Sequence, residues 1–255
     1  MTKSFEIPKA LVWKAFQRVK ANGGSSGVDG ESIEAFERNL SGNLYKIWNR
    51  MVSGSYFPPP VKSVPIPKRT GGTRILGVPT VADRIAQTAV KMVLEPLLEP
   101  VFDDNSFGYR PGRSALDAVE LVRRRSWKYD WVVEFDVKAL FDAIDHGWLV
   151  KFVEHRIADR RVVRLIQKWL NAGVLEDGKR MLVGEATPQG GSASPLLANI
   201  YLHYAFDLWV QAWRRKQASG DVIVVRFADD IAIGFQNESD AKRFWTELRS
   251  REIII

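Results

Sequence analysis

Two adjacent carboxylates, Asp229 and Asp230, lie between two short apolar runs rich in β-branched residues, 222–227 and 231–235. Such runs predict a β-hairpin that carries the carboxylates at its turn. Holding two like charges side by side costs free energy unless a positive charge compensates them, so one interpretation is a divalent metal site. The other is a water-exposed turn, in which Asp is a common residue. The hairpin alone leaves both interpretations open.

A third carboxylate, Asp136, ends an alternating apolar stretch over residues 131–136, which predicts a strand that delivers Asp136 at its end. Asp142 and Asp145, a few residues later, are interpreted as helix caps or surface carboxylates. The chain has no cysteine, and its three histidines show no metal-ligand spacing. Any metal would therefore be a hard cation bound by oxygen, of which Mg²⁺ is the most common.

Basic residues gather in two further places. Residues 61–79 predict two edge strands joined by a glycine turn, with Lys68, Arg69 and Arg74 near the tip. Three cations at a hairpin tip suit a phosphate-rich ligand, although a solvated basic turn is the commoner outcome. Arginines also alternate with aromatic residues over 107–114, and the helix that follows ends in a run of three arginines, both features of a nucleic-acid track.

Several helices must position these groups. Amphipathic patterns predict helices over residues 8–20, 32–44, 83–94, 115–127, 148–170 and from 194 to beyond 212. Asp83 and Ser114 are expected to cap two of them. The last helix has one apolar stripe, which is typical of core packing and consists of Leu196, Ile200, Tyr204, Leu208 and Ala212. The glycine-rich loop before it, 187–195, allows a backbone to approach a ligand closely.

The composition indicates a globular protein with a polyanionic partner. The 255 residues include 37 Lys and Arg against 30 Asp and Glu, giving a net charge of +7 and a pI near 9.6. Nucleic acid and an anionic membrane surface both fit that charge. No apolar run approaches the length of a membrane span, and residues 1–8 lack the apolar core of a signal peptide. We therefore expect a cytoplasmic protein with no membrane partner.

Taken together, the motifs of the chain resemble those of the reverse transcriptases of the group II intron lineage. The resemblance covers almost the whole chain and keeps the family's motif order. Its parts are Gly27-Val28-Asp29-Gly30, Ile66-Pro67-Lys68, residues 77–84, residues 107–114, Phe135-Asp136-Val137, residues 188–191, residues 194–199 and Arg226-Phe227-Ala228-Asp229-Asp230. Any one of these motifs is weak, whereas the ordered set is highly specific. Phe227 departs from the tyrosine that the family usually has at this position.

The resemblance implies an α+β fold, the fingers and palm of a right-hand polymerase, with an antiparallel palm sheet backed by helices. The expected fingers are residues 1–112 and 146–186, and the expected palm is residues 113–145 and 187–255. No helical thumb follows Leu248 in this sequence, so weak or absent activity of the isolated chain is one expected outcome. The oligomeric state is left open, with a dimer among the alternatives.

The resemblance also implies roles for particular residues. Asp136 and Asp229 are the expected principal ligands of two Mg²⁺ ions, for which Mn²⁺ is a substitute, with Asp230 and the carbonyl of Val137 supporting them. The expected nucleotide contacts are Lys68, Arg69 and Arg74 to the triphosphate, Phe141 as a gate against the 2′-hydroxyl, and Gln189 and Gly190 to the nucleotide and templating base. Arg110, Arg113 and Arg123 are expected to hold template and primer.

The function so implied is an RNA-directed DNA polymerase that extends a DNA primer with dNTPs on an RNA template. Two alternatives are kept. One is an RNA-binding maturase that retains the polymerase fold and helps to splice its own intron RNA. The other is an RNA-templated RNA polymerase, against which Phe141 argues.

Overall fold

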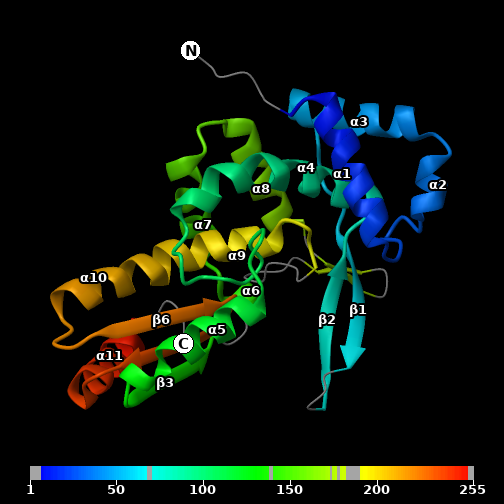
Figure 1. Cartoon of the computed structure of the whole chain (residues 1–255). Helices are drawn as coiled ribbons and strands as arrows, with labels where there is room; N and C mark the ends of the chain where they lie inside the picture. The colour runs from blue at the N-terminus through cyan, green and yellow to red at the C-terminus, as the bar shows by residue number, and fades with distance from the viewer. Residues whose placement is uncertain are drawn as a thin grey trace. The chain divides into compact units, whose positions relative to one another are not determined.

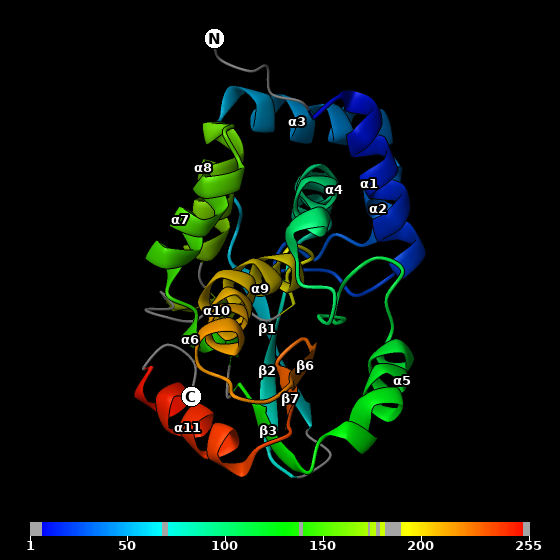
Figure 2. The same cartoon turned by 60° about the vertical axis from the view of Figure 1, so that its left-hand side comes forward.

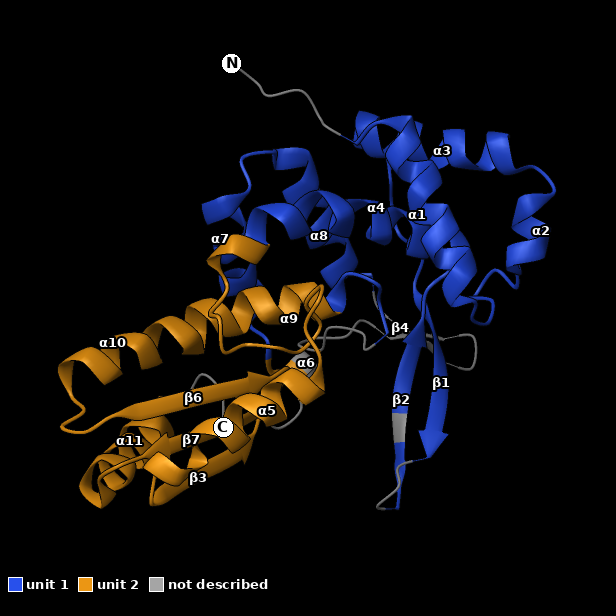
Figure 3. Ribbon diagram, in the orientation of Figure 1, with its two compact units in different colours: residues 1–98, 144–194 blue, residues 99–143, 195–255 orange. Residues whose placement is uncertain are grey.

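The alternating stretches form two sheets in the computed structural model, which describes residues 7–67, 71–137, 140–172, 174–176, 179–181 and 190–251. The side chains of residues 74, 141, 142, 174–176 and 179–181 are outside the description. The chain divides into two compact units, residues 1–98 with 144–194 and residues 99–143 with 195–255 (Figure 3). Each unit therefore combines two separate segments of the chain. The assignment of fingers and palm, whose boundaries differ from these by 2 to 14 residues, stays a prediction.

The sheet of the second unit has the order β3-β7-β6, all antiparallel. Its strands are β3 (Trp131–Asp136), β6 (Val222–Phe227) and β7 (Asp230–Phe235). The central strand β7 is almost wholly apolar because both of its faces are covered, whereas β3 alternates apolar and acidic residues. The register places Asp136 directly opposite Asp230. The predicted strand and hairpin thus meet at one end of the sheet.

Helices cover both faces of this sheet (Figure 2). On one face, α5 (Ala115–Arg125) packs Ala118 against Ile223 and Val225 of β6. On the other, aromatic pairs join the sheet to the long helix and to α11 (Glu238–Ser250), among them Phe135 with Phe206 and Trp245, and Phe235 with Trp213 and Phe244. Short elements η1 (Glu99–Val101), η2 (Ser126–Lys128) and α6 (Leu140–Ala143) complete the unit.

The long helix that begins near the unit boundary is not uniformly α-helical. It runs through α9 (Ser194–Leu202), a π-helical segment η3 (His203–Asp207) and α10 (Leu208–Lys216). The π segment inserts one extra residue and rotates the buried face. The predicted stripe is therefore wrong beyond Ile200: Tyr204 is only half-buried and Leu208 is 40% exposed, while the residues that pack inward are His203, Phe206, Asp207, Val210 and Trp213.

The first unit holds a four-stranded sheet of order β2-β1-β4-β5. Its strands are β1 (Val61–Pro67), β2 (Thr73–Val78), β4 (Val174–Glu176) and β5 (Lys179–Met181). The hairpin of β1 and β2 confirms the predicted pair of strands. The prediction that both are edge strands is wrong for β1, because β4 pairs with its other side. Strand β4 pairs with β1 only at Val61 and Lys62. The prolines of β1, Pro65 and Pro67, lie opposite Ile75 and Thr73 of β2 and beyond the described pairing with β4, so each has a partner strand on one side in the described structure.

The helices of the first unit pack around α4 (Val81–Leu98) (Figure 1). The others are α1 (Lys9–Asn22), α2 (Ile33–Glu37), α3 (Leu40–Ser53), α7 (His146–Arg156) and α8 (Arg160–Leu170). The helix predicted over 148–170 is in fact two, because Asp159 accepts a hydrogen bond from the N–H of Arg161 and so starts a second helix. In the described part of the chain, no helix combines the length and apolarity needed to cross a membrane.

Candidate active site

The hairpin turn brings the predicted carboxylates to one end of the β3-β7-β6 sheet. Ala228 and Asp229 form the two-residue turn between β6 and β7, and Ala228 adopts the left-handed conformation with φ 57°. The N–H of Val137 donates a 3.2 Å hydrogen bond to the carbonyl of Asp229 and so extends the pairing of β3 past its last residue. Residues more than ninety positions apart in the sequence are thereby joined in register.

The three carboxylates interact electrostatically. Asp136 and Asp230 are exposed and Asp229 is half-buried. Burial raises the pKa of Asp229, and the negative charges of Asp136 and Asp230 raise it further, against a backbone hydrogen bond that lowers it. Like charges directly opposite each other on paired strands also destabilise a sheet. A bound cation would relieve both effects.

The chemistry of this end of the sheet fits a hard divalent cation, because the side-chain donors are carboxylate oxygens without thiolate or imidazole. What fits the cation is the type of donor atom and the strand pairing that brings the three residues to one end of the sheet. Over the described residues, no three His, Cys, Asp or Glu side chains stand close enough to hold a metal ion as they are. A bound ion would therefore require the carboxylates to turn toward it. Val137, whose carbonyl is a predicted ligand, is buried.

A largely apolar cavity of about 300 Å³ lies beside the carboxylates. Ala118, Val119 and Val122 of α5 line it on one side, and Asp136 and Asp230 line it on the sheet. The cavity contacts two of the three predicted catalytic residues. Its α5 side is apolar, although Val119 and Val122 are themselves exposed to solvent.

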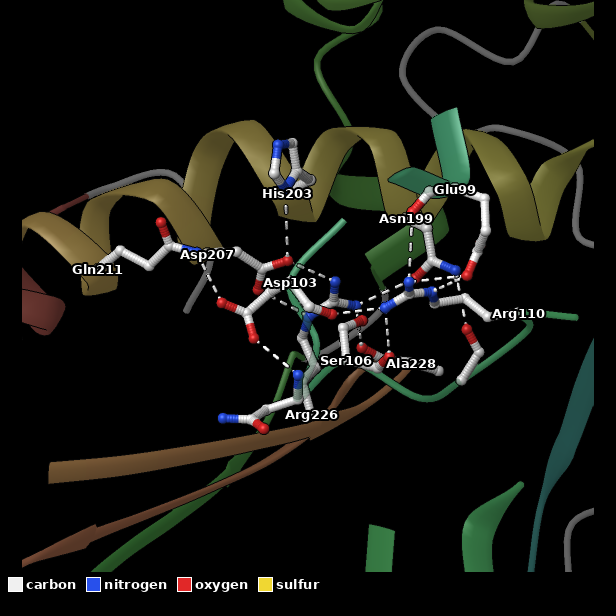
Figure 4. A network of polar contacts seen from close by, with 12 residues as sticks. Glu99, Asp103, Ser106, Arg110, Asn199, His203, Asp207, Gln211, Arg226 and Ala228 are labelled. Atoms are coloured by element: carbon white, nitrogen blue, oxygen red, sulfur yellow. Dashed lines mark hydrogen bonds and ion pairs between the residues drawn. The ribbon is translucent and has the colours of Figure 1, made fainter. Parts of the chain in front are cut away.

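Behind the hairpin, Arg226 is fully buried and forms the centre of a polar network that the sequence did not reveal (Figure 4). Its guanidinium makes a two-pronged ion pair with Asp207, with Nε–Oδ1 2.9 Å and Nη2–Oδ2 2.7 Å. Its Nη1 donates to Oδ1 of Asn199 and to the carbonyl of Ala228, each at 3.1 Å. His203 Nδ1 lies 3.9 Å from Asp207 Oδ2.

The arginines predicted to hold nucleic acid differ in their surroundings. Arg110 is buried, with a 2.7 Å ion pair to Glu99 and hydrogen bonds to the carbonyls of Asp103 and Ser106. The prediction that Arg110 contacts template or primer is therefore corrected: its donors stabilise the loop that contains them. The side chain of Arg113 is 25% exposed and pairs with Asp104, whereas that of Arg123 is 82% exposed.

Most of the predicted nucleotide contacts cannot be placed. Lys68, Arg69 and Gln189 lie outside the described residues, as do the side chains of Arg74 and Phe141. The backbone of Arg74 belongs to β2 and pairs with Ile66. Gly190 is described: its φ is +116°, and a Cβ added there would lie 2.3 Å from the carbonyl oxygen of Gly77. Only glycine fits this approach of the loop to β2.

The prediction that Asp83 caps its helix is wrong. Thr80 takes the cap position by accepting from the N–H of Asp83 at 3.2 Å. The buried Asp83 carboxylate instead accepts hydrogen bonds from Tyr56 (2.7 Å), Trp169 (2.8 Å) and Gln87 (2.9 Å). Burial raises the pKa of Asp83, and these three hydrogen bonds oppose that rise.

Comparison with protein-family models matches residues 66–252 to the family described as reverse transcriptase (RNA-dependent DNA polymerase). The group II intron-encoded protein LtrA of Lactococcus lactis subsp. cremoris is 39% identical over 196 residues, which are 76% of this chain and 32% of that protein. The nuclear intron maturase 2, mitochondrial, of Arabidopsis thaliana is 33% identical over 102 residues, 38% of this chain and 14% of that one. The chain thus spans about a third or less of the length of these relatives.

Among solved structures, the chain is similar to one in a partial Cas6-RT-Cas1–Cas2 complex, with a TM-score of 0.54 and 22% sequence identity. The match covers 95% of this chain and 40% of that chain. A structural similarity at 22% sequence identity is evidence about the fold of the chain and not about its function. It agrees with the expected α+β architecture of polymerase fingers and palm.

Proposed function

The chain belongs to the reverse transcriptase (RNA-dependent DNA polymerase) family and is of the group II intron type, and from that premise we propose that it extends a DNA primer with dNTPs on an RNA template. The observation that carries the proposal is the register of the second sheet. It pairs Asp136 with Asp230 and joins Val137 to Asp229, so that three carboxylates share one end of the sheet.

In the proposed reaction, Asp136 and Asp229 would hold the metal, supported by Asp230 and the carbonyl of Val137. Two Mg²⁺ ions bound there, or Mn²⁺ in their place, would activate the primer 3′-hydroxyl and neutralise the leaving pyrophosphate. The protein's own contribution is to fix Asp136 and Asp230 on paired strands and Asp229 in the tight turn beside them, which hold a site more accurately than a free loop does.

The proposed nucleotide contacts come from the other motifs. Lys68, Arg69 and Arg74 would bind the triphosphate through charge-assisted hydrogen bonds. Gln189 and Gly190 would approach the nucleotide and the templating base, and Phe141 would exclude a 2′-hydroxyl by its bulk. Replacing Phe141 with Ala should then admit ribonucleotides, as measured by the ratio of dNTP to NTP incorporation. An unchanged ratio would refute the gate.

Template and primer would be held through their phosphates. The net charge of +7 supports an electrostatic, salt-sensitive interaction. Arg113 and Arg123 are the proposed contacts among the described arginines, since both side chains are at least partly exposed. The compartment proposed for this protein is the cytoplasm.

Primer extension by the full 255-residue chain on an RNA template tests the polymerase proposal. We expect extension with Mg²⁺ and dNTPs, its loss with a chelator, and its loss in Asp229→Asn. Asp130→Asn is the matched control, because this exposed residue precedes β3 at the end opposite to Asp136. Extension by Asp229→Asn at the rate of the control would reject the proposed catalytic centre.

A maturase role is the second candidate, favoured by the similarity to a protein named as an intron maturase. It predicts that structured intron RNA binds more tightly than a generic duplex of equal length in a filter-binding assay. Equal affinities would count against it. An RNA template extended with ribonucleotides by the unaltered chain would instead support an RNA-templated RNA polymerase.

A further inference from the structure

Three sequence motifs that are far apart in the chain meet behind the turn that carries Asp229. Arg226 comes from β6, Asn199 and Asp207 from the long helix, and Gly108 from the loop before α5. Asn199 links them, since it accepts from Arg226 and its Nδ2 donates to the carbonyl of Gly108 at 2.8 Å. The contacts among these four residues lie within the protein itself.

The contacts converge on Ala228, the residue before Asp229. Its left-handed φ of 57° is uncommon for a residue other than glycine and requires support from its surroundings. Arg226 Nη1 supplies that support by donating to the Ala228 carbonyl. Gly108 supplies a second restraint, because its backbone lies so close that an added Cβ would be 2.2 Å from the nitrogen of Ala228.

The loop that contains Gly108 is itself fixed to the same strand. The N–H of Phe107 donates to the carbonyl of Arg226 at 2.8 Å, and the N–H of Arg226 donates to the carbonyl of Asn105 at 2.9 Å. The backbone of Arg226 therefore holds the loop while its side chain holds the turn. The positive charge of Arg226 is paired with Asp207, so its influence on the hairpin is geometric.

The π segment completes the arrangement. Asn199 and Asp207 are the two residues of the long helix that contact Arg226. The π segment begins after Asn199 and ends at Asp207, so it changes the angle between these two side chains around the helix axis. In a regular α-helix, side chains eight residues apart are separated by about 80° around the axis. The extra residue in the π turn changes that angle, which lets both side chains reach one guanidinium.

We propose that Arg226, Asn199, Asp207 and Gly108 form a clamp that positions the Asp229 turn against Val137, and so sets the metal affinity and turnover of the site. These are positioning residues that act through the turn. The consequence for catalysis rests on the proposed polymerase function, whereas the consequence for the turn does not.

The first test therefore measures the turn directly, by hydrogen exchange of the Val137 amide, whose acceptor is the carbonyl of Asp229. Arg226→Lys keeps the charge but cannot contact Asp207, Asn199 and Ala228 together. We expect it to accelerate exchange at Val137 at least tenfold while amides inside the strands, such as that of Ile233, stay protected. Asn199→Ala provides a second, milder variant with the same expected direction.

Asp240→Asn is the matched control. Asp240 is also buried in the second unit and accepts hydrogen bonds from the N–H groups of Ser219 and Gly220, away from the Asp229 turn. Asp240→Asn should leave the exchange rate of the Val137 amide unchanged. The clamp would be overturned if the Val137 amide exchanged as slowly in both clamp variants as in the unaltered chain. It would also be overturned if the Asp240→Asn control lost as much protection at Val137 as the clamp variants.

The second test concerns the site. In the clamp variants, we expect Mn²⁺ to bind at least tenfold more weakly by electron paramagnetic resonance, and kcat to fall at least tenfold. The KM for dNTP and the affinity for template should change less than twofold. A KM effect without a change in Mn²⁺ binding would reject the proposed link to the metal. Failure of the unaltered chain to extend a primer would count against polymerase activity of this chain by itself. The clamp would then be judged by the exchange rate of the Val137 amide and by Mn²⁺ binding.

Discussion

Tyr56→Phe should lower the free energy of unfolding, because it removes a hydrogen bond to the buried Asp83 carboxyl group. Tyr56→Phe removes one hydroxyl and keeps the ring and its edge-on contact with Trp169. The lost hydrogen bond is 2.7 Å long and ends on a buried carboxyl group that keeps two other donors. A hydrogen bond to a charged group contributes about 1.5–3 kcal/mol, so the free energy of unfolding should fall by that amount at any pH where Asp83 is ionised.

The cost of Tyr56→Phe should depend on pH with a definite sign. Burial raises the folded-state pKa of Asp83, so the native state favours the protonated carboxyl and loses stability as pH rises through that pKa. The Tyr56 hydrogen bond lowers this pKa, so its removal raises the pKa further and enlarges the loss. The cost should therefore be greatest where Asp83 is ionised. Below its pKa the cost should shrink to the ~0.5–1.5 kcal/mol of a neutral hydrogen bond.

Urea unfolding followed by far-ultraviolet circular dichroism, repeated from about pH 5 to about pH 8, measures both effects. Burial raises the pKa of Tyr56 well above its ordinary value, so its hydroxyl stays protonated throughout. Tyr45→Phe is the matched control, because the side chain of Tyr45 is half exposed. Equal costs for the two variants, or a Tyr56→Phe cost that grows toward low pH, would refute the reasoning.

Three further outcomes are expected. Gly190→Ala should lower the melting temperature in calorimetry more than Gly71→Ala, because both have positive φ but only the former places a Cβ against a β2 carbonyl; the difference tests the fit of that loop. Arg123→Ala should reduce the slope of log affinity against log salt by about 0.7–0.9, measured by template binding; an unchanged slope would exclude a phosphate contact. The affinity for Mn²⁺, measured by electron paramagnetic resonance, should fall at low pH with a midpoint above the pKa of an ordinary carboxyl, since the pKa of Asp229 is raised in the metal-free chain. Asp230→Asn should lower that midpoint in the pH profile by removing a neighbouring charge.

The sequence predicted the strands and the hairpin of the second sheet because their periodicity reflects their burial directly. Alternation over 131–136 marked β3, and two β-branched runs around Asp229 marked β6 and β7. The cap of α5 by Ser114 was predicted correctly for a similar reason, since a cap is a local hydrogen bond; the structure adds Asp117, which completes a capping box with it. The register that pairs Asp136 with Asp230 depends on contacts between distant segments and is a finding of the structure. The family resemblance implied only that Asp136 and Asp229 share a metal site.

The buried polar groups could not be predicted from local patterns. Arg226 occupies an inward position of β6, where alternation alone leads one to expect an apolar residue, and its partner Asp207 lies in a helix whose face a π segment has shifted. Asp83 likewise has the sequence of a cap, whereas its acceptors are satisfied by residues 27 and 86 positions away. Arg110 was misassigned because a basic loop looks alike in sequence whether its arginine faces solvent or its own backbone.

The interleaving of the two units has a consequence for how the chain folds during synthesis. The first unit is complete once residue 194 has been made. At that point β3 has no partner strand in its sheet, because β7 has not yet been synthesised. At typical synthesis rates, this strand remains unpaired for on the order of ten seconds, which is a hazard for aggregation. Glu134 and Asp136 place negative charge on the waiting strand. Charges on an unpaired edge oppose association with other chains, so Asp136 would oppose aggregation of β3 until β7 has been made, in addition to its proposed role in catalysis.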